Sequence, residues 1–255
     1  MTRRNVFTAG AALAAPLAAA APKRSILDLR WFWMRNGNQA ARTTDFLANT
    51  FVPAHKRLGG GTFGFFSAVI AEHSPFIVAL LSFPSLAGLE EFGEALSADK
   101  DFQRGLAAYE APSEPAYVRM ETTFLRAFPS MPSIEVPAAA EGRAPRIFEL
   151  RTYESHSQTA SKRKVKMFDD AEIAIFRRCG MTPVFFGETI AGRNLPNLTY
   201  MLAFDDLAAR DKAWRTFAAD PEWLKLRATP GLTDPEIVSN ISNAILRPLP
   251  FSQIR

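Results

Sequence analysis

Cysteine, histidine and long apolar runs are scarce in this chain of 255 residues. Its one cysteine, Cys179, excludes an intramolecular disulfide and a cysteine-rich zinc site. With three histidines, the sequence gives no reason to expect a metal centre, and we expect no metal and no other cofactor. The formal net charge of +4 is too small to indicate a nucleic-acid partner. The 47% of hydrophobic and 22% of charged residues are values of a globular chain and exclude wholesale disorder.

Residues 1–21 have the layout of an export signal. Arg3 and Arg4 precede an apolar run from Val6 to Ala15, and alanines follow at 18–21. The paired arginines resemble a twin-arginine signal, although Phe7 stands one place later than in the usual pattern. The run is shorter than the ~20 residues that a membrane span needs. We therefore expect an exported protein, periplasmic or extracellular, with no stable membrane span after signal removal; the alternative is an anchor that is retained.

The rest of the chain repeats itself. Residues 26–130 align without gaps on residues 147–251, so that Ile26–Arg30 falls on Ile147–Arg151 at a constant shift of 121 positions. A period this long indicates two copies of one domain, not a solenoid. We expect a first repeat at 22–130, a Pro/Ala-rich linker at 131–146 and a second domain at 147–255.

Each copy predicts the element order βαββαβ, the ferredoxin-like unit, and hence an α+β fold. A four-stranded sheet with both helices on one side leaves its other face bare. We therefore expect the two antiparallel sheets to pack on each other as a pseudo-dimeric α/β barrel, within one chain or across a homodimer. Alternation and helical spacing place the strands near 26–33, 62–70, 76–83, 117–126, 147–153, 183–190, 198–204 and 237–246, with a helix near 161–179 and a second from 206.

An acid-x-Arg pair occurs on the first strand of both copies. Because side chains alternate along a strand, Glu149, Arg151 and Tyr153 share one face, and Asp28, Arg30 and Phe32 share the matching face. We expect this face to point away from the helices and into the barrel.

The last strand of each copy should lie beside the first. This predicts that Arg119 and Glu121 approach Asp28 and Arg30. Asn240 and Ser242 occupy the matching places in the second copy, which leaves Arg151 freer to meet a ligand. The candidate ligand-binding residues are therefore Glu149, Arg151, Tyr153, Glu188, Tyr200, Asn240, Asp28, Arg30, Arg119 and Glu121, and no catalytic residue is assigned.

Two interpretations of these charges stay open. Buried charges must be paired or hydrated, so one interpretation is a satisfied ion-pair network under the sheets. The other is a polar pocket that binds a small anionic or carbonyl-bearing ligand. Two further residue groups have structural interpretations: His55 near the end of the first helix suits the helix dipole as a cation, and the basic run 162–166 suits a solvated face.

The second copy resembles the NIPSNAP family. The residues that carry the resemblance are Phe148–Tyr153, Gly180–Gly187, Asn197–Leu202, Arg210 and Asp220–Trp223. The resemblance implies a ferredoxin-like, dimeric α/β-barrel fold and no settled reaction. Animal members are tied to mitochondria, a role that an exported protein would not share. The barrel superfamily also includes cofactor-independent monooxygenases and haem-degrading enzymes, which is an analogy of fold alone.

Two functions follow as hypotheses. The first is a module that binds a small ligand or a partner. The alternative is a metal-independent enzyme, monooxygenase- or isomerase-like, that uses the barrel interior around Arg151. In that enzyme, Arg151 would stabilise charge electrostatically, and Glu149 or Tyr153 would act as acid or base.

Overall fold

The computed structural model describes residues 23–138 and 145–255. The export signal expected at 1–21 lies outside these residues, and so do residues 139–144 of the expected linker 131–146. The first lobe consists of β1 (Ile26–Trp33), α1 (Gln39–Phe46), η1 (Leu47–Phe51), α2 (Val52–Arg57), β2 (Phe63–Ile70), β3 (Phe76–Phe83), α3 (Leu86–Ala98), α4 (Lys100–Glu110) and β4 (Arg119–Ala127). The second consists of β5 (Ile147–Glu154), α5 (Gln158–Met167), η2 (Phe168–Glu172), α6 (Ile173–Arg178), β6 (Thr182–Ala191), β7 (Asn197–Phe204), α7 (Leu207–Ala219), α8 (Pro221–Arg227), α9 (Asp234–Ile237) and β8 (Asn240–Pro248).

The eight strands close one antiparallel barrel in the order β1-β3-β2-β8-β5-β7-β6-β4. Each lobe contributes a sheet with its fourth strand beside its first, as the ferredoxin-like order requires. The lobes join at two seams, β2 with β8 and β4 with β6. The expected α+β barrel of two packed sheets is therefore confirmed, and it closes within one chain.

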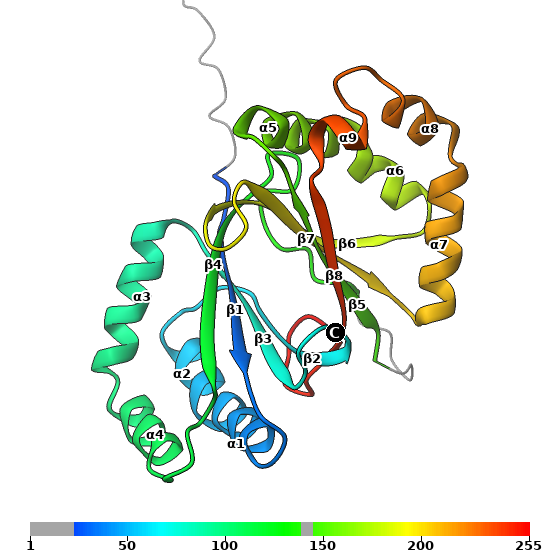
Figure 1. Cartoon of the computed structure of the whole chain (residues 1–255). Helices are drawn as coiled ribbons and strands as arrows, with labels where there is room; N and C mark the ends of the chain where they lie inside the picture. The colour runs from blue at the N-terminus through cyan, green and yellow to red at the C-terminus, as the bar shows by residue number, and fades with distance from the viewer. Residues whose placement is uncertain (1–22, 139–144) are drawn as a thin grey trace, which may run out of the picture.

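The helices lie outside the barrel, α1–α4 over the first sheet and α5–α9 over the second (Figure 1). This arrangement creates three apolar cores. One fills the barrel and includes Leu29, Phe66, Phe148 and Leu150. The other two lie between each sheet and its own helices. None of the helices in the described ranges combines the length and the apolar character that crossing a membrane requires.

The segment that follows the last strand of each lobe forms a backbone hydrogen bond with the other lobe. Phe128 N donates to Phe186 O at 3.0 Å, and Leu249 N donates to Phe65 O at 2.8 Å. The two bonds are related by the shift of 121 positions seen in the sequence. Residues 249–255 continue over the first lobe, where Ser252 Oγ accepts from Phe65 N at 3.0 Å.

Two local details differ from the expected elements. The single helix expected at 161–179 contains the π-helical turn η2, and η1 repeats this turn in the first lobe. The last strand starts at Asn240 rather than 237, because Thr233 and Glu236 form a capping box that begins the short helix α9.

Candidate functional site

The acid-x-Arg pairs point toward the helices, so the expected orientation into the barrel is wrong. Glu149 and Arg151 contact helix α7, whereas Phe148 and Leu150, their neighbours on β5, belong to the barrel core. Alternation fixes which residues share a face, but it does not decide which face lies in the barrel and which lies under the helices. The barrel interior is narrow and filled with large apolar side chains, while α7 supplies the polar partners that buried charges need. The alternative enzyme hypothesis located Arg151 in the barrel interior, but the structure places it outside that interior.

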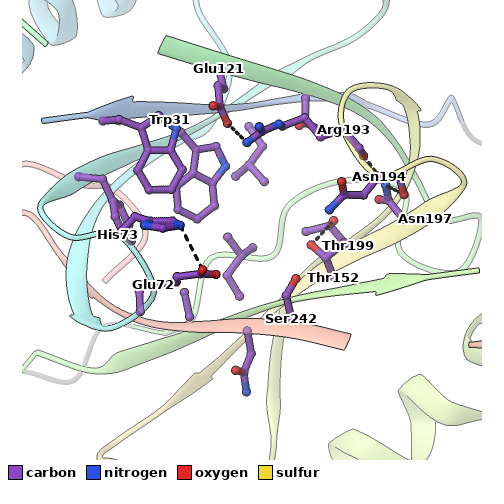
Figure 2. A pocket seen from close by; sticks show the side chains of 18 of the residues that line it. Trp31, Glu72, His73, Glu121, Thr152, Arg193, Asn194, Asn197, Thr199 and Ser242 are labelled. Carbon is purple, nitrogen blue, oxygen red and sulfur yellow. Dashed lines mark hydrogen bonds and ion pairs between the residues drawn. The ribbon is translucent and has the colours of Figure 1, made fainter. Parts of the chain in front are cut away.

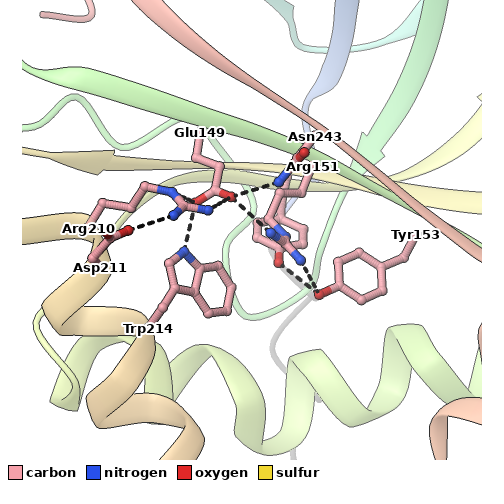
Figure 3. A network of polar contacts seen from close by, with 8 residues as sticks. Glu149, Arg151, Tyr153, Arg210, Asp211, Trp214 and Asn243 are labelled. Carbon is pink, nitrogen blue, oxygen red and sulfur yellow. Dashed lines mark hydrogen bonds and ion pairs between the residues drawn. The ribbon is translucent and has the colours of Figure 1, made fainter. Parts of the chain in front are cut away.

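Glu149 is the centre of a closed polar network (Figure 3). The carboxylate is fully buried. Arg210 of α7 donates to it twice, from Nη2 to Oε1 at 2.7 Å and from Nε to Oε2 at 2.9 Å. Trp214 Nε1 donates to Oε2 at 2.7 Å, and Arg151 Nη1 donates to Oε1 at 2.9 Å. Asn243 Nδ2 of β8 adds a longer contact of 3.3 Å. The network joins β5, β8 and α7.

These partners keep Glu149 ionised. Burial alone would raise the pKa of the Glu149 carboxyl, but the hydrogen bonds from Arg210 and the charge of Arg151 outweigh it and lower the pKa below its usual range. Arg151 also lies over the Trp214 ring, with 4.6 Å from Cζ to the ring centroid. Since donors surround both carboxylate oxygens, the group is a structural anion rather than a free acid or base. This supports the ion-pair interpretation of the strand.

Two tyrosines extend the network into the core. Arg151 Nη2 donates to Tyr153 Oη at 3.1 Å, and Tyr200 Oη lies 3.4 Å from Tyr153 Oη. Tyr200 is fully buried, and burial raises its pKa well above the usual value. The structure thus brings together four predicted residues, Glu149, Arg151, Tyr153 and Tyr200.

Lys164 is buried, so the solvated face expected for the basic run is wrong at this position. Its Nζ lies 3.3 Å from Glu172 Oε2, and both side chains are almost fully buried. Nζ also lies over the rings of Tyr153 and Phe168, at 5.2 and 4.8 Å from their centroids. Burial raises the pKa of Glu172 despite the opposing charge of Lys164. This second ion pair lies on helices α5 and η2, beneath Tyr153.

The first lobe carries a thinner version of the network. Arg30 Nη2 donates to Asp28 Oδ2 at 2.6 Å, but the other carboxylate oxygen, Oδ1, is buried with no hydrogen-bond partner among the described residues. At the shift of 121, Arg210 and Trp214 correspond to Leu89 and Gly93, which donate nothing from their side chains. Burial accordingly raises the pKa of Asp28 even though Arg30 opposes it.

Other predicted residues lie elsewhere. Arg119 and Glu121 do not approach Asp28 and Arg30: they pair across from Trp33 and Trp31, on the opposite face of the sheet. Asn240 donates to Glu154 at 2.9 Å, outside the Glu149 network.

Glu188 faces the helix side of β6. It lies opposite Leu198 of β7, and no hydrogen bond in the described part of the chain joins it to Glu149. His55 is structural but not as a cation: its ring is fully buried among phenylalanines, and burial lowers its pKa to about 4. The helix dipole is too weak an influence to offset that burial.

A pocket of about 370 Å³ opens at one end of the barrel (Figure 2). Its lining includes Leu29 and Leu150 of the barrel core and residues of the turns 71–73 and 193–194. On one wall the indoles of Trp31 and Trp33 stack at 5.2 Å with an interplanar angle of 9°. We call this space the barrel-mouth pocket.

Charge gathers at one side of the barrel-mouth pocket. Glu121 forms ion pairs with both Arg119 and Arg193, the latter at 2.9 Å. The Arg119 guanidinium also lies 5.3 Å from the centroid of the Trp33 ring. Two cations thus share one carboxylate beside a flat aromatic wall, and the side chain of Arg193 is 67% exposed.

The opposite side carries hydroxyl and amide groups. Thr152 and Thr199 share a hydrogen bond of 2.9 Å, and Ser242 lies beside them. Sequence reasoning missed most of this pocket, because it assigned the barrel interior to the wrong face. When the opposite face of each strand is assigned to the barrel interior, the same alternation selects Trp31, Trp33 and Thr152. Among residues 23–138 and 145–255, no three His, Cys, Asp or Glu side chains are grouped to hold a metal ion.

Solved structures share the whole barrel at low sequence identity. A candidate monooxygenase from Fusobacterium nucleatum is 10% identical, with a TM-score of 0.55 over 89% of this chain and 93% of its own. An anthrone oxidase-like protein is also 10% identical, with a TM-score of 0.55 over 91% of this chain and 94% of its own. At this identity the likeness shows the fold alone.

The family model and a NIPSNAP-like structure each match less than half of the chain. An uncharacterized NIPSNAP-like domain protein from Burkholderia xenovorans is 24% identical over 42% of this chain and 88% of its own, with a TM-score of 0.38. No curated protein matches the chain. The NIPSNAP family model matches residues 148–253, from the start of β5 to beyond β8. The second lobe is therefore similar to the NIPSNAP family over nearly its whole length.

Proposed function

We propose that this protein binds a small ligand with a carboxylate or carbonyl group in the barrel-mouth pocket. The observation that carries the proposal is the sharing of Glu121 by Arg119 and Arg193. One carboxylate neutralises one of the two guanidiniums, so this side keeps an excess positive charge. The other carboxylate among the lining residues, Glu72, is 85% exposed and lies 3.1 Å from Nε2 of His73. A ligand carboxylate would accept hydrogen bonds from an arginine that Glu121 does not saturate.

The aromatic wall supports a flat ligand. Trp31 and Trp33 are both partly exposed and line the pocket, so a ring or a conjugated carbonyl can pack against their indoles. Thr152, Thr199 and Ser242 would offer hydroxyl groups to its polar edge. A volume of about 370 Å³ is within the size of small-molecule sites.

Location and assembly are part of the proposal. The sequence of residues 1–21 supports export to the periplasm or the exterior, by a twin-arginine-type route. A homodimer remains a proposal too, but the pocket is lined by both lobes of one chain and needs no second copy. Light scattering of the purified protein measures its oligomeric state.

Benzoate titration tests the site. Trp31 and Trp33 are two of the four tryptophans, so benzoate binding should change the intrinsic fluorescence. Arg119→Gln and Arg193→Gln should each weaken benzoate binding by about tenfold, since each removes a charge-assisted hydrogen bond. Arg104→Gln on the exposed face of α4 is the matched control. Equal benzoate affinity in all three variants would contradict the proposal. So would a wild-type protein that binds neither benzoate nor any member of a wider panel of aromatic carboxylates.

A further inference from the structure

The two lobes differ in what fills the space between sheet and helices. At the shift of 121 positions, Tyr200 of β7 corresponds to Ala79 of β3, and Phe217 of α7 corresponds to Leu96 of α3. The second lobe has the larger side chain at both places. The difference concerns the helix side of the sheet, away from the barrel-mouth pocket.

The second lobe is filled. The Tyr200 ring is fully buried and stacks on Phe186, with ring centroids 4.9 Å apart and an interplanar angle of 13°. Phe168 approaches the same ring at 5.3 Å. A phenol group therefore occupies the middle of this core.

The first lobe has a cavity of about 150 Å³ at the corresponding place. Its lining includes Ala79 and Leu96, the two smaller residues. Aromatic rings surround it, from Phe51, Phe65 and Phe102. A cavity of this size with an apolar lining is large enough for one benzene-sized ring. We call it the first-lobe cavity.

Arg30 is the one arginine among the residues that line the first-lobe cavity. Arg30 donates to Asp28, and it has no second hydrogen bond in the described part of the chain. The corresponding Arg151 has an additional acceptor, the hydroxyl of Tyr153, which Phe32 lacks in the first lobe. The Arg30 side chain is 31% exposed, so it can reach a small molecule that enters the cavity.

We propose that the first-lobe cavity binds a neutral molecule with a single aromatic ring and one oxygen substituent, of the phenol class. The ring takes the place that the Tyr200 ring holds in the second lobe. Its oxygen accepts a hydrogen bond from Arg30, as Tyr153 does from Arg151. A neutral ligand is favoured over an anion because two carboxylates, Asp28 and Glu110, stand against the single positive charge of Arg30. This inference does not depend on the function proposed for the barrel-mouth pocket.

Methyl NMR of the full chain, titrated with phenol, tests the proposal. The methyl groups of Ala79, Leu81 and Leu96 should shift and saturate at millimolar phenol. Ala79→Tyr fills the cavity with the residue of the second lobe and should weaken phenol binding at least tenfold. Leu96→Phe is a second filling variant, should Ala79→Tyr fail to fold, and the exposed Arg104→Gln should leave phenol binding unchanged.

The oxygen contact has its own test. Arg30→Met should lower the affinity for phenol about tenfold, toward that for benzene, and leave benzene binding unchanged. Phenol shifts that persist in both filling variants, or that appear only at the methyl groups of Leu29 and Leu150 in the barrel-mouth pocket, would overturn the proposal. So would the absence of any saturable shift. Benzoate titration of the same samples reports separately on the barrel-mouth pocket.

Discussion

The indole Nε1 of Trp214 donates a hydrogen bond of 2.7 Å to Oε2 of Glu149. This bond joins helix α7 to strand β5, and Arg210 from the preceding turn of α7 adds two more to the same carboxylate. The carboxylate thereby fixes the position of α7 on the second sheet. Its counterpart Asp28 has one partner, Arg30, from its own strand.

Glu149→Gln should destabilise the protein by about 3–5 kcal/mol, because it leaves Arg151 and Arg210 without their buried counter-charge. Trp214→Phe should cost about 1–3 kcal/mol, since it keeps the ring but removes the donor. Urea unfolding measures both. The control is Asp28→Asn, for which we expect a smaller loss because only one partner is affected. A loss for Asp28→Asn equal to that for Glu149→Gln would contradict the anchoring role.

Lys164 and Glu172 should show strong coupling in a double-mutant cycle. Either single replacement leaves a buried charge alone and should cost about 3–5 kcal/mol. The first lobe has Thr43 and Phe51 at the corresponding positions, so the double variant Lys164→Thr/Glu172→Phe reproduces a combination that the fold already packs. We expect this double variant to be more stable than at least one of the two single variants. Additive losses in denaturant unfolding would show that the pair does not act as a unit.

His55 should make stability depend on pH between about 6.5 and 4. Its pKa is 6.5 when exposed and about 4 in the fold, where burial disfavours the charged ring. As the pH falls through this window, the unfolded chain takes up a proton that the folded chain cannot, so the free energy of unfolding falls. The full loss approaches about 3 kcal/mol below pH 4.

The variant His55→Leu isolates this effect. Between pH 5 and 6.5 the slope of unfolding free energy against pH should flatten, whatever the variant's absolute stability. Glu149 has a lowered pKa, so its contribution is present above the usual carboxyl range and is lost only at lower pH. An unchanged slope in His55→Leu between pH 5 and 6.5 would assign the pH dependence to another group.

An arginine–aspartate clamp recurs in both lobes at the shift of 121. Arg178 Nη2 donates to Asp220 Oδ1 at 2.8 Å, and Arg57 Nη2 donates to Asp99 Oδ2 at 2.7 Å. Each aspartate also caps a helix, where Asp220 accepts from Trp223 N at 3.0 Å. We expect Asp220→Ala to lower the melting temperature more than Arg178→Ala, because an exposed ion pair contributes little beyond the cap. The reverse order would show that the ion pair, and not the cap, is the stabilising contact.

The local elements, and the pairing of the last strand of each copy with its first, could be predicted from the sequence alone. Alternation located β1 and β5, and the spacing of apolar residues located the helix after each, because these periods are properties of the backbone. The gap-free shift of 121 also aligned Arg57 with Arg178 and Asp99 with Asp220, which the structure shows as matching clamps.

The assignment of one face of each sheet to the barrel interior required the packing of the folded chain. Alternation groups Glu149 with Arg151 and Tyr153 in either case, since a strand has two faces of equal period. The choice depended on partners far away in the sequence. Arg210 and Trp214 satisfy the charges from the helix side, and the barrel interior accepts Phe148 and Leu150. The barrel-mouth pocket and the first-lobe cavity are likewise products of packing, because each depends on which side chains fill a space that several distant segments enclose.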